Sequence, residues 1–311
     1  MITMEKIVMS KLLIVGSIAL DSVQTPFGSV EGAVGGSAVY ASYAASVFCN
    51  PAVVGVVGDD FPKREVTRMR GKGIDTEGLE TVQGGKTFSW GGKYFEDINQ
   101  RETLFTHLNV FEKFAPKLPD SYRGIRDVFL ANIDPDLQID VLRQARKPRL
   151  VVCDTMNLWI NIKRDSLLKL LKQIHVLLLN DEEARMLGDT TSLVKAADAI
   201  RRRGVERLLI KKGEHGCLMF GPEGVFSAPA LALPVVKDPT GAGDTFAGGM
   251  LGWMAGRPLT PANWRKAILV GTAMASFCVE DFSVKRLRGV TAEAVSARTA
   301  TLRAMMQVGK V

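Results

Sequence analysis

Residues that commonly build metal centres and disulfides are scarce in this chain. Its 311 residues include 3 histidines and 4 cysteines, with no C-x-x-C pair and no histidine at metal-ligand spacing. Isolated thiols are typical of buried side chains in a reducing compartment. The sequence therefore argues against disulfides, structural zinc and a catalytic thiol, and it favours a cytoplasmic protein. The cysteines are Cys49, Cys153, Cys217 and Cys278.

Long apolar runs, linkers and repeats are also missing. No run approaches the ~20 residues that a membrane helix needs, and no Pro- or Ser-rich segment divides the chain. Hydrophobic residues make up 46% and charged residues 23%, an ordinary globular composition. We therefore expect one domain over residues 1–311, without membrane attachment. The N-terminus lacks a signal-peptide pattern, and the stretch from Met9 resembles a natural start, so residues 1–8 are predicted to be an extension with little structure.

Basic residues exceed acidic ones, giving a formal net charge of +7, but the basic clusters lack interleaved aromatics. Nucleic-acid binding is one interpretation of such clusters. The run 201–203, however, ends a predicted helix before Gly204, where cations suit the helix dipole in any protein. The other cluster is Lys285, Arg286 and Arg288. The charge balance therefore does not require a nucleic-acid partner.

Short apolar runs alternate with helical patterns along most of the chain. Continuous apolar strands between helices are typical of a mostly parallel sheet that is covered on both faces. The sequence therefore predicts the α/β class. The predicted strands are 12–15, 53–57, 128–131, 150–153, 176–179 and 208–210, and the predicted helices are 37–48, 136–146, 163–173, 181–187, 192–203, 262–279 and 291–307.

Two segments do not fit this alternation. Residues 19–34 are rich in Gly and Val, and residues 84–110 place Phe88, Trp90, Gly92 and Tyr94 at period two. Period two indicates antiparallel strands with one covered face. We interpret both segments as parts of a small β lid that is inserted into the α/β core.

The most informative stretch is 238–249, Asp-Pro-Thr-Gly-Ala-Gly-Asp-Thr-Phe-Ala-Gly-Gly. It follows the apolar run 231–236, a predicted strand, and leads into a predicted helix over 246–254. Gly241, Ala242 and Gly243 have almost no side chain, so their N–H groups at a helix start can form an anion hole for phosphate. Asp244 fits there as the base that accepts a proton from an attacking hydroxyl. The alternative is an ordinary turn with Asp244 as helix cap.

This stretch resembles the C-terminal signature of the ribokinase (PfkB) family of small-molecule kinases, and further family elements follow in order over residues 11–305. The resemblance implies a ribokinase-like three-layer α/β/α core with a β lid that often mediates dimerisation. It also implies ATP and Mg²⁺ as cofactors, and it leaves a monovalent-cation requirement open. A mildly basic protein that binds ATP explains the net charge.

On the acceptor side, the resemblance assigns Asp21 to sugar hydroxyls and Gly35 and Gly36 to a hinge beneath the lid. Read alone, without the resemblance, Asp21 is better explained as a loop cap. Tyr40 departs from the family pattern, since many relatives carry an Asn there that contacts the substrate. This departure argues against recognition of a simple sugar.

On the nucleotide side, Asn180 and Glu183 match an Asn-x-x-Glu element that organises Mg²⁺, chiefly through water. The same residues form a capping-box pattern that needs no metal. Lys211 stands where many relatives have Thr, and a phosphate contact by it is open. The resemblance also assigns Gly213 and Gly216 to the loop beneath the nucleotide, and Thr240, Ala273 and Ser276 to the ATP site.

Flat aromatic surface in the lid favours a nucleobase over a bare sugar as the substrate. Phe88, Trp90 and Tyr94, with Tyr40, supply that surface, which favours a nucleoside. The overall pattern also resembles the nucleoside (adenosine) kinase-like branch of the family, so a purine nucleoside such as adenosine is the leading hypothesis. The rings could instead pack the lid or a homodimer interface. Ribose, fructose or a sugar phosphate is the alternative acceptor. A non-catalytic sensor is disfavoured because both Asp244 and Glu183 are present, and the first strand lacks the G-x-G-x-x-G of a nicotinamide dehydrogenase.

Overall fold

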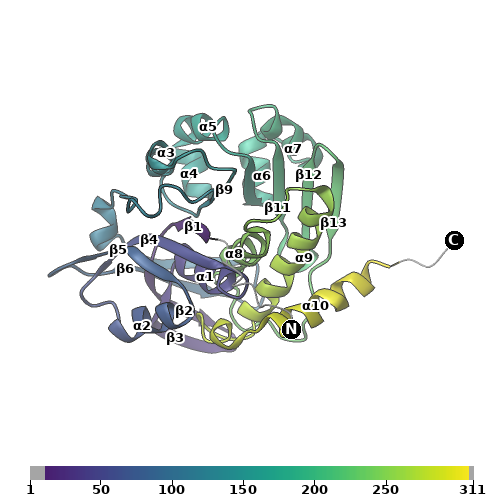
Figure 1. The fold of residues 1–311 in the computed structure, drawn as a ribbon. Coiled ribbons are helices and arrows are strands. Elements are labelled where there is room, and N and C mark those ends of the chain that lie inside the picture. The colour runs from purple at the N-terminus through teal and green to yellow at the C-terminus, as the bar shows by residue number, and fades with distance from the viewer. Residues whose placement is uncertain (1–10, 308–311) are drawn as a thin grey trace, which may run out of the picture.

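A nine-stranded sheet forms the centre of the computed structural model, which describes residues 11–307 (Figure 1). The predicted extension 1–8 lies outside the described residues. The sheet order is β13-β12-β11-β10-β9-β8-β1-β4-β5, parallel from β5 to β11 and antiparallel over β12 and β13. The strands are β1 (Lys11–Val15), β4 (Asn50–Gly58), β5 (Asp75–Val82), β8 (Asp127–Leu130), β9 (Leu150–Asp154), β10 (Val176–Asn180), β11 (Arg207–Lys211), β12 (Cys217–Gly221) and β13 (Gly224–Ala228).

Helices cover both faces of this sheet, which confirms the three-layer prediction. Successive strand residues point to opposite faces, so Leu12 and Ile14 enter one core while Leu13 and Val15 enter the other. The first core packs against α1 (Ser37–Ala45), α2 (Lys63–Gly71), α8 (Ala242–Met254), α9 (Pro261–Cys278) and α10 (Ala292–Met305). The second packs against α3 (Pro135–Gln144), α4 (Asn157–Ile162), α5 (Arg164–Leu171), α6 (Asp181–Gly188) and α7 (Leu193–Arg201).

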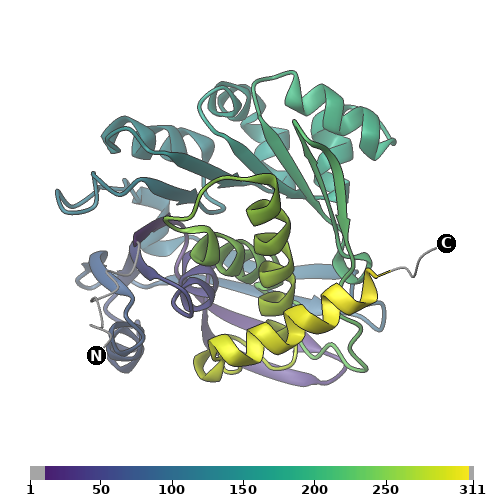
Figure 2. The ribbon, with the colours of Figure 1, turned by 45° about the vertical axis from the view of Figure 1, so that its right-hand side comes forward.

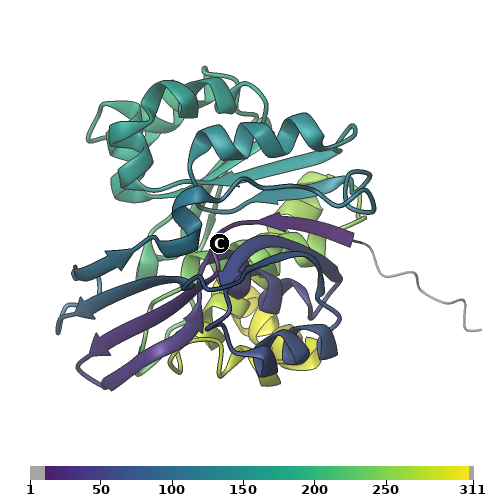
Figure 3. The same ribbon diagram turned by 90° about the vertical axis from the view of Figure 1, so that its left-hand side faces the viewer.

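A second sheet of four strands forms the lid, as the period-two pattern predicted. Its order is β3-β2-β6-β7, built from β2 (Ala19–Thr25), β3 (Gly28–Gly35), β6 (Phe88–Tyr94) and β7 (Arg101–His107). The two hairpins are antiparallel, but β2 and β6 pair in parallel, so the lid is mixed rather than wholly antiparallel. Figure 3 shows these purple and blue strands projecting from one side of the core.

The predicted strand over 231–236 is wrong, because residues 229–240 form an irregular connection. Pro234 lies within it and has no N–H to donate to a ladder. At the end of the connection, the N–H groups of Lys237 and Asp238 both donate to Val279 O, at 2.7 and 3.3 Å. A loop after α9 thus fixes the approach to α8.

Helix α8 is glycine-rich because two helices approach its backbone closely (Figure 2). A Cβ at Gly248 would overlap the backbone of Ala41 in α1, and one at Gly252 would lie 2.6 Å from Ala45 Cα. On the α9 side, a Cβ at Gly249 would lie 2.6 Å from Met274 Cγ. These contacts fix the position of the helix whose first turn carries Asp244.

None of the helices between residues 11 and 307 is both long and apolar enough to cross a membrane. Within the same range, all four cysteines are buried and free of disulfides.

Candidate active site

Asp244 lies in the first turn of α8, which begins after Gly241. Gly241 is the N-cap and has no side chain. The alternative interpretation, an ordinary turn in which the Asp244 carboxylate caps the helix, is therefore wrong. One N–H of the predicted anion hole is already used, since Ala242 N donates to Pro239 O at 3.1 Å. The anion hole therefore depends on the neighbouring N–H groups at this helix start, including Gly243 and Asp244.

Tyr40 forms the wall beside this turn. Gly241 has φ +74°, a left-handed conformation that favours glycine, and a Cβ there would overlap the Tyr40 ring. The Tyr40 side chain is 1% exposed, and burial raises the pKa of its phenol well above the ordinary value. Tyr40, at the position where many relatives carry an Asn, is therefore a neutral ring that packs against the Gly241 backbone.

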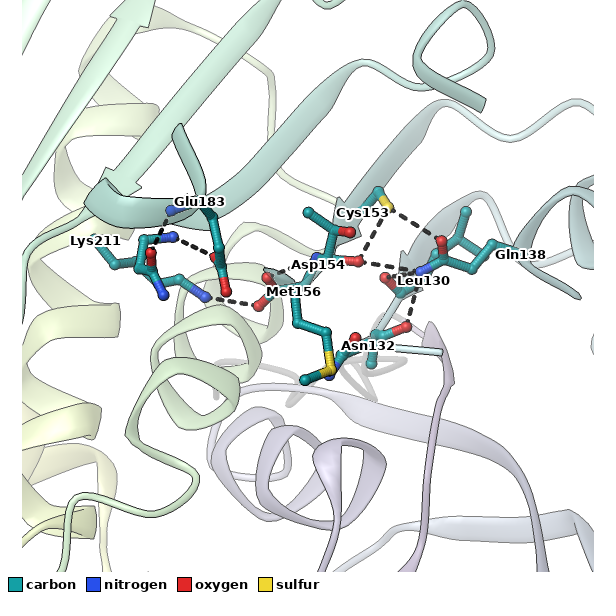
Figure 4. Close-up of polar contacts among 11 residues, drawn as sticks. Leu130, Asn132, Gln138, Cys153, Asp154, Met156, Glu183 and Lys211 are labelled. Carbon is teal, nitrogen blue, oxygen red and sulfur yellow. Dashed lines mark hydrogen bonds and ion pairs between the residues drawn. The ribbon is translucent and has the colours of Figure 1, made fainter. Parts of the chain in front are cut away.

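Three strand ends bring further charges to the same place (Figure 4). Lys211, the last residue of β11, donates from Nζ to Asp154 Oδ2 at 2.7 Å, and Asp154 is the last residue of β9. Glu183, at the start of α6 after β10, lies close enough to influence Lys211. Parallel strands present their carboxyl ends at one edge, which is where ligands bind in such sheets. Asp154, Glu183, Lys211 and Asp244 therefore form one charged cluster.

The charges in this cluster are strongly coupled. Burial raises the pKa of Asp244 to about 7, with a further increase from Asp154 and an opposing effect of Lys211. Burial also raises the pKa of Glu183 to about 7. Burial opposes the charged form of Lys211, but Asp154 and Glu183 outweigh it and raise the pKa of the ammonium. Such perturbed groups gathered at a sheet edge are typical of a catalytic site.

Asp21 joins this cluster from the lid. It lies on β2, within the predicted lid segment 19–34 and not in a loop cap, and it is 5% exposed. Its Oδ2 would overlap a Cβ on Gly35, and the Gly36 N–H lowers its pKa, although burial and the nearby Asp238 and Asp244 raise that pKa to about 7 overall. The predicted hinge glycines therefore leave room for this carboxylate.

The lid aromatics divide into two groups. Trp90 pairs in register with Asp21 and packs with Val23, Tyr94 and Phe282. Phe88 instead contacts Phe111, with ring centroids 5.3 Å apart. Phe88 is therefore engaged in packing beside the lid, whereas Trp90 is the register partner of Asp21 and its ring lies over Gly92 of the same strand.

Two lid residues form hydrogen bonds to the connection before α8 and to the loop after β11. Tyr94 Oη lies 3.2 Å from Thr240 Oγ1, in the connection before α8. Asn99, in the turn between β6 and β7, donates to Glu214 Oε1 at 3.4 Å, in the loop that contains Gly213 and Gly216. Both glycines have positive φ, 54° and 79°, so this loop has the tight shape that glycine permits. The lid is therefore closed onto the loops predicted to hold the nucleotide.

Asn180 and Glu183 form a complete capping box. Asn180 Oδ1 accepts from Glu183 N at 2.8 Å, and Glu183 Oε2 accepts from Asn180 N at 2.7 Å. The bonds use one of the two Glu183 oxygens. No group of three or more His, Cys, Asp or Glu side chains within residues 11–307 is arranged to hold a metal ion. A carboxylate and an amide oxygen fit Mg²⁺ held through water, not in a protein cage.

Ala273 and Ser276 both lie in α9. Ser276 Oγ donates to Ala273 O and accepts from Arg298 Nη1 at 2.8 Å, so both residues belong to the contact between α9 and α10. Asp154 is the residue that the sequence analysis missed. It ends the apolar run 150–153 as Asn180 and Lys211 end theirs, and the same rule of polar residues after strands could have found it.

Comparison with known proteins agrees with this fold. The pfkB family carbohydrate kinase pattern matches residues 9–287. A cytidine kinase of Thermococcus kodakarensis is 28% identical over 257 residues, covering 81% of this chain and 91% of that protein. The solved nucleoside kinase of Methanocaldococcus jannaschii superposes with a TM-score of 0.76 at 21% identity, over 94% of this chain and 99% of the other. The solved structure of the Burkholderia thailandensis nucleoside kinase in complex with inosine superposes with a TM-score of 0.76 at 22% identity. This match covers 93% of this chain and 97% of the other.

The fold and the site define a phosphotransferase of the ribokinase type. The chain belongs to the pfkB family of carbohydrate kinases, and it is a kinase.

Proposed function

We propose that this kinase transfers the γ-phosphoryl group of ATP to a hydroxyl of a nucleoside, with Asp244 as the general base. The observation that carries the proposal is the placement of Asp244. Its half-buried carboxylate lies in the first turn of α8, at the start of that helix and within the field of Lys211. A base of pKa about 7 is well matched to proton transfer near neutral pH.

In the reaction, the acceptor oxygen attacks the γ-phosphorus and forms an O–P bond. The bond between the γ-phosphorus and the β–γ bridging oxygen breaks, ADP leaves, and the hydroxyl proton passes to Asp244. N–H groups at the start of α8 stabilise the charge on the transferring phosphoryl oxygens, mainly in the transition state. Asp21 orients the acceptor through its hydroxyls, and the closed lid excludes water as a competing acceptor. Mg²⁺, held through water by Asn180 and Glu183, would neutralise phosphate charge.

A nucleoside acceptor is supported by the surroundings of Asp21. Trp90, the register partner of Asp21 on the neighbouring lid strand, offers a flat ring in the same sheet as the carboxylate that would hold the ribose hydroxyls. Arg101, a candidate for binding a sugar phosphate, instead stacks over Trp90 at 5.2 Å from its ring. The relatives are named cytidine kinase and nucleoside kinase, the latter in complex with inosine. Purine nucleosides such as adenosine remain our first expectation, and cytidine is the direct competitor.

The test is ATP consumption by the purified protein with Mg²⁺, across adenosine, inosine, cytidine, uridine, ribose, fructose and fructose phosphate. We expect the highest kcat/KM with a nucleoside. Preference for a free sugar would contradict the nucleoside assignment but not the kinase assignment. Absence of turnover with every acceptor, in protein that binds ATP, would favour a sensor.

The pH dependence of turnover tests the role of Asp244. Because its pKa is about 7 and its charged form is the base, kcat/KM should be constant above pH 8 and fall about tenfold per pH unit below pH 6. The profile is recorded with saturating Mg²⁺ at each pH. ATP affinity is measured in parallel, so that protonation of ATP is separated from protonation of the enzyme. A flat profile between pH 5.5 and 8.5 would rule out this base.

The hydroxyl of Tyr94 tests the closed lid. Tyr94→Phe keeps the ring and removes the bond to Thr240. A typical hydrogen bond contributes ~0.5–1.5 kcal/mol, so we expect kcat/KM to fall about two- to tenfold. Thr240→Val should give the same loss, and the double variant no more than either single one. Full additivity in the kinetic measurements would show that the two hydroxyls act separately.

We also propose a cytoplasmic enzyme that forms a homodimer through the lid, as the family resemblance implies. Leu104 and Phe27, both in the lid sheet or its turn, are 45% and 51% exposed and support this proposal. Sedimentation of the native protein and of a Leu104→Glu variant measures the oligomeric state and tests whether the dimer forms through the lid.

A further inference from the structure

Asp154 is held more firmly than a simple surface ion pair would require. Its Oδ2 accepts from Lys211 Nζ at 2.7 Å, and its Oδ1 accepts from Thr155 N at 2.9 Å. Its backbone is clamped as well, since the buried Gln138 donates from Nε2 to Asp154 O at 3.1 Å and to Ala131 O at 2.9 Å. Figure 4 shows Gln138 and Lys211 on opposite sides of Asp154. Both carboxylate oxygens are therefore fixed in direction.

The partner of Asp154 lies against the anion hole. A Cβ on Gly243 would lie 3.1 Å from Lys211 Nζ, so the ammonium touches the first turn of α8. The same ammonium lies in the field of Glu183 and of Asp244. A flexible lysine among three carboxylates could be drawn towards any of them, and its ion pair with Asp154 selects one position.

That position is the one that phosphoryl transfer needs. The transferring group carries negative charge on its equatorial oxygens and gains most from donors that are already in place. Lys211 has three donors, and Asp154 occupies one of them, which leaves the others for an anion at the helix start.

We propose that Asp154 is a positioning residue for the kinase reaction, which holds the Lys211 ammonium at the N-terminus of α8 to bind the transferring phosphoryl group. This inference rests on the proposed function, because it assigns a role within the same site. Two other roles for Asp154 are direct contact with a metal ion and a purely structural ion pair with Lys211. Each of the three roles predicts a different result for the variants below.

The variants are Asp154→Asn, Lys211→Met and the double variant, which removes both charges of the ion pair together. Asp127→Asn is the matched control. Asp127 pairs with Arg149 at 2.8 Å at the start of β8, with side-chain exposures of 6% and 22%, against 5% and 20% for Asp154 and Lys211. It lies at the opposite ends of the strands from the charged cluster.

We expect Asp154→Asn to lower kcat about 10–100-fold, with the KM for the nucleoside unchanged, and Lys211→Met to lower kcat at least as much. The double variant should match Lys211→Met, because Asp154 has no function without the lysine. Asp127→Asn should lose thermal stability but keep its kcat. A kcat for Asp154→Asn within twofold of the native value would overturn the proposal, and so would a further loss in the double variant.

A second measurement separates this inference from the proposed function. Calorimetric binding of ATP and of ADP, without acceptor, reports the γ-phosphate contact even if no acceptor is turned over. Asp154→Asn and Lys211→Met should each weaken ATP binding about tenfold and ADP binding less than twofold. Equal losses for the two nucleotides, or no loss, would overturn the inference whatever the substrate proves to be.

Discussion

Asp244→Asn should fold as the native chain does and turn over its substrate ~10²–10⁴-fold more slowly, the usual range for loss of a general base. The amide has the shape of the carboxylate but cannot accept the hydroxyl proton. Because the amide keeps the shape of the carboxylate in the first turn of α8, the KM for both substrates should change little. Steady-state kinetics with the best acceptor measure the effect.

The same variant should be more stable than the native protein at high pH. Burial raises the pKa of Asp244 from 3.8 to about 7, so the folded state binds its proton more tightly than the unfolded state does. Stability from this group is present below pH 4 and is lost as the pH rises through 7. Since one pKa unit corresponds to ~1.4 kcal/mol, the ionised carboxylate costs up to about 4 kcal/mol above pH 7.

Thermal unfolding at pH 8 and pH 5 checks this expectation. Asp244→Asn should raise the Tm clearly at pH 8 and less at pH 5. Glu77→Gln, at an exposed carboxylate of β5, is the control and should change neither the Tm nor kcat. A variant that is both fully active and no more stable would contradict the base and its burial together.

Gly241→Ala should lower kcat/KM for ATP by about 10²-fold, because it moves the backbone that we propose binds the transferring phosphoryl group. Gly241 has φ +74°, and an added Cβ would overlap the Tyr40 ring. Tyr40 is fully buried in α1 and cannot turn away, so the first turn of α8 must shift. Kinetics at varied ATP concentration measure the loss.

Gly84→Ala separates the clash from the backbone strain. Gly84 has φ +70°, close to that of Gly241, but no atom lies within 4 Å of the added Cβ. Both variants should lose ~1–2 kcal/mol of stability from the left-handed conformation. Only Gly241→Ala should lose activity, and equal kinetic effects of the two would refute the role of the Tyr40 contact.

The parts of this molecule that could be predicted are those set by neighbours in sequence. The glycines and Asp244 form one local turn and helix, and the capping box of Asn180 and Glu183 spans three residues. The run 231–236 was misread because its apolar character says nothing about a ladder partner, and Pro234 removes a donor. Asp154 was missed because its importance comes from Lys211, 57 residues later, and the two meet only when β9 and β11 flank β10.

The lid contacts follow the same rule. Tyr94 and Thr240 are 146 residues apart, and no pattern within either segment predicts their hydrogen bond. The period-two pattern predicted the lid strands, since alternation is a local property. Which lid aromatic pairs with Asp21 depends on the register between β2 and β6, and no pattern within either segment alone fixes that register.

The glycine face of α8 makes the site mechanically stiff. Where a helix packs through side chains, a change of rotamer can absorb a small displacement, but backbone against backbone has no such freedom. Helix α1 begins directly after Gly36 at the base of the lid and rests on Gly248 and Gly252 of α8. A displacement of α1 at the base of the lid should therefore displace α8, the helix that carries Asp244, by nearly the same amount.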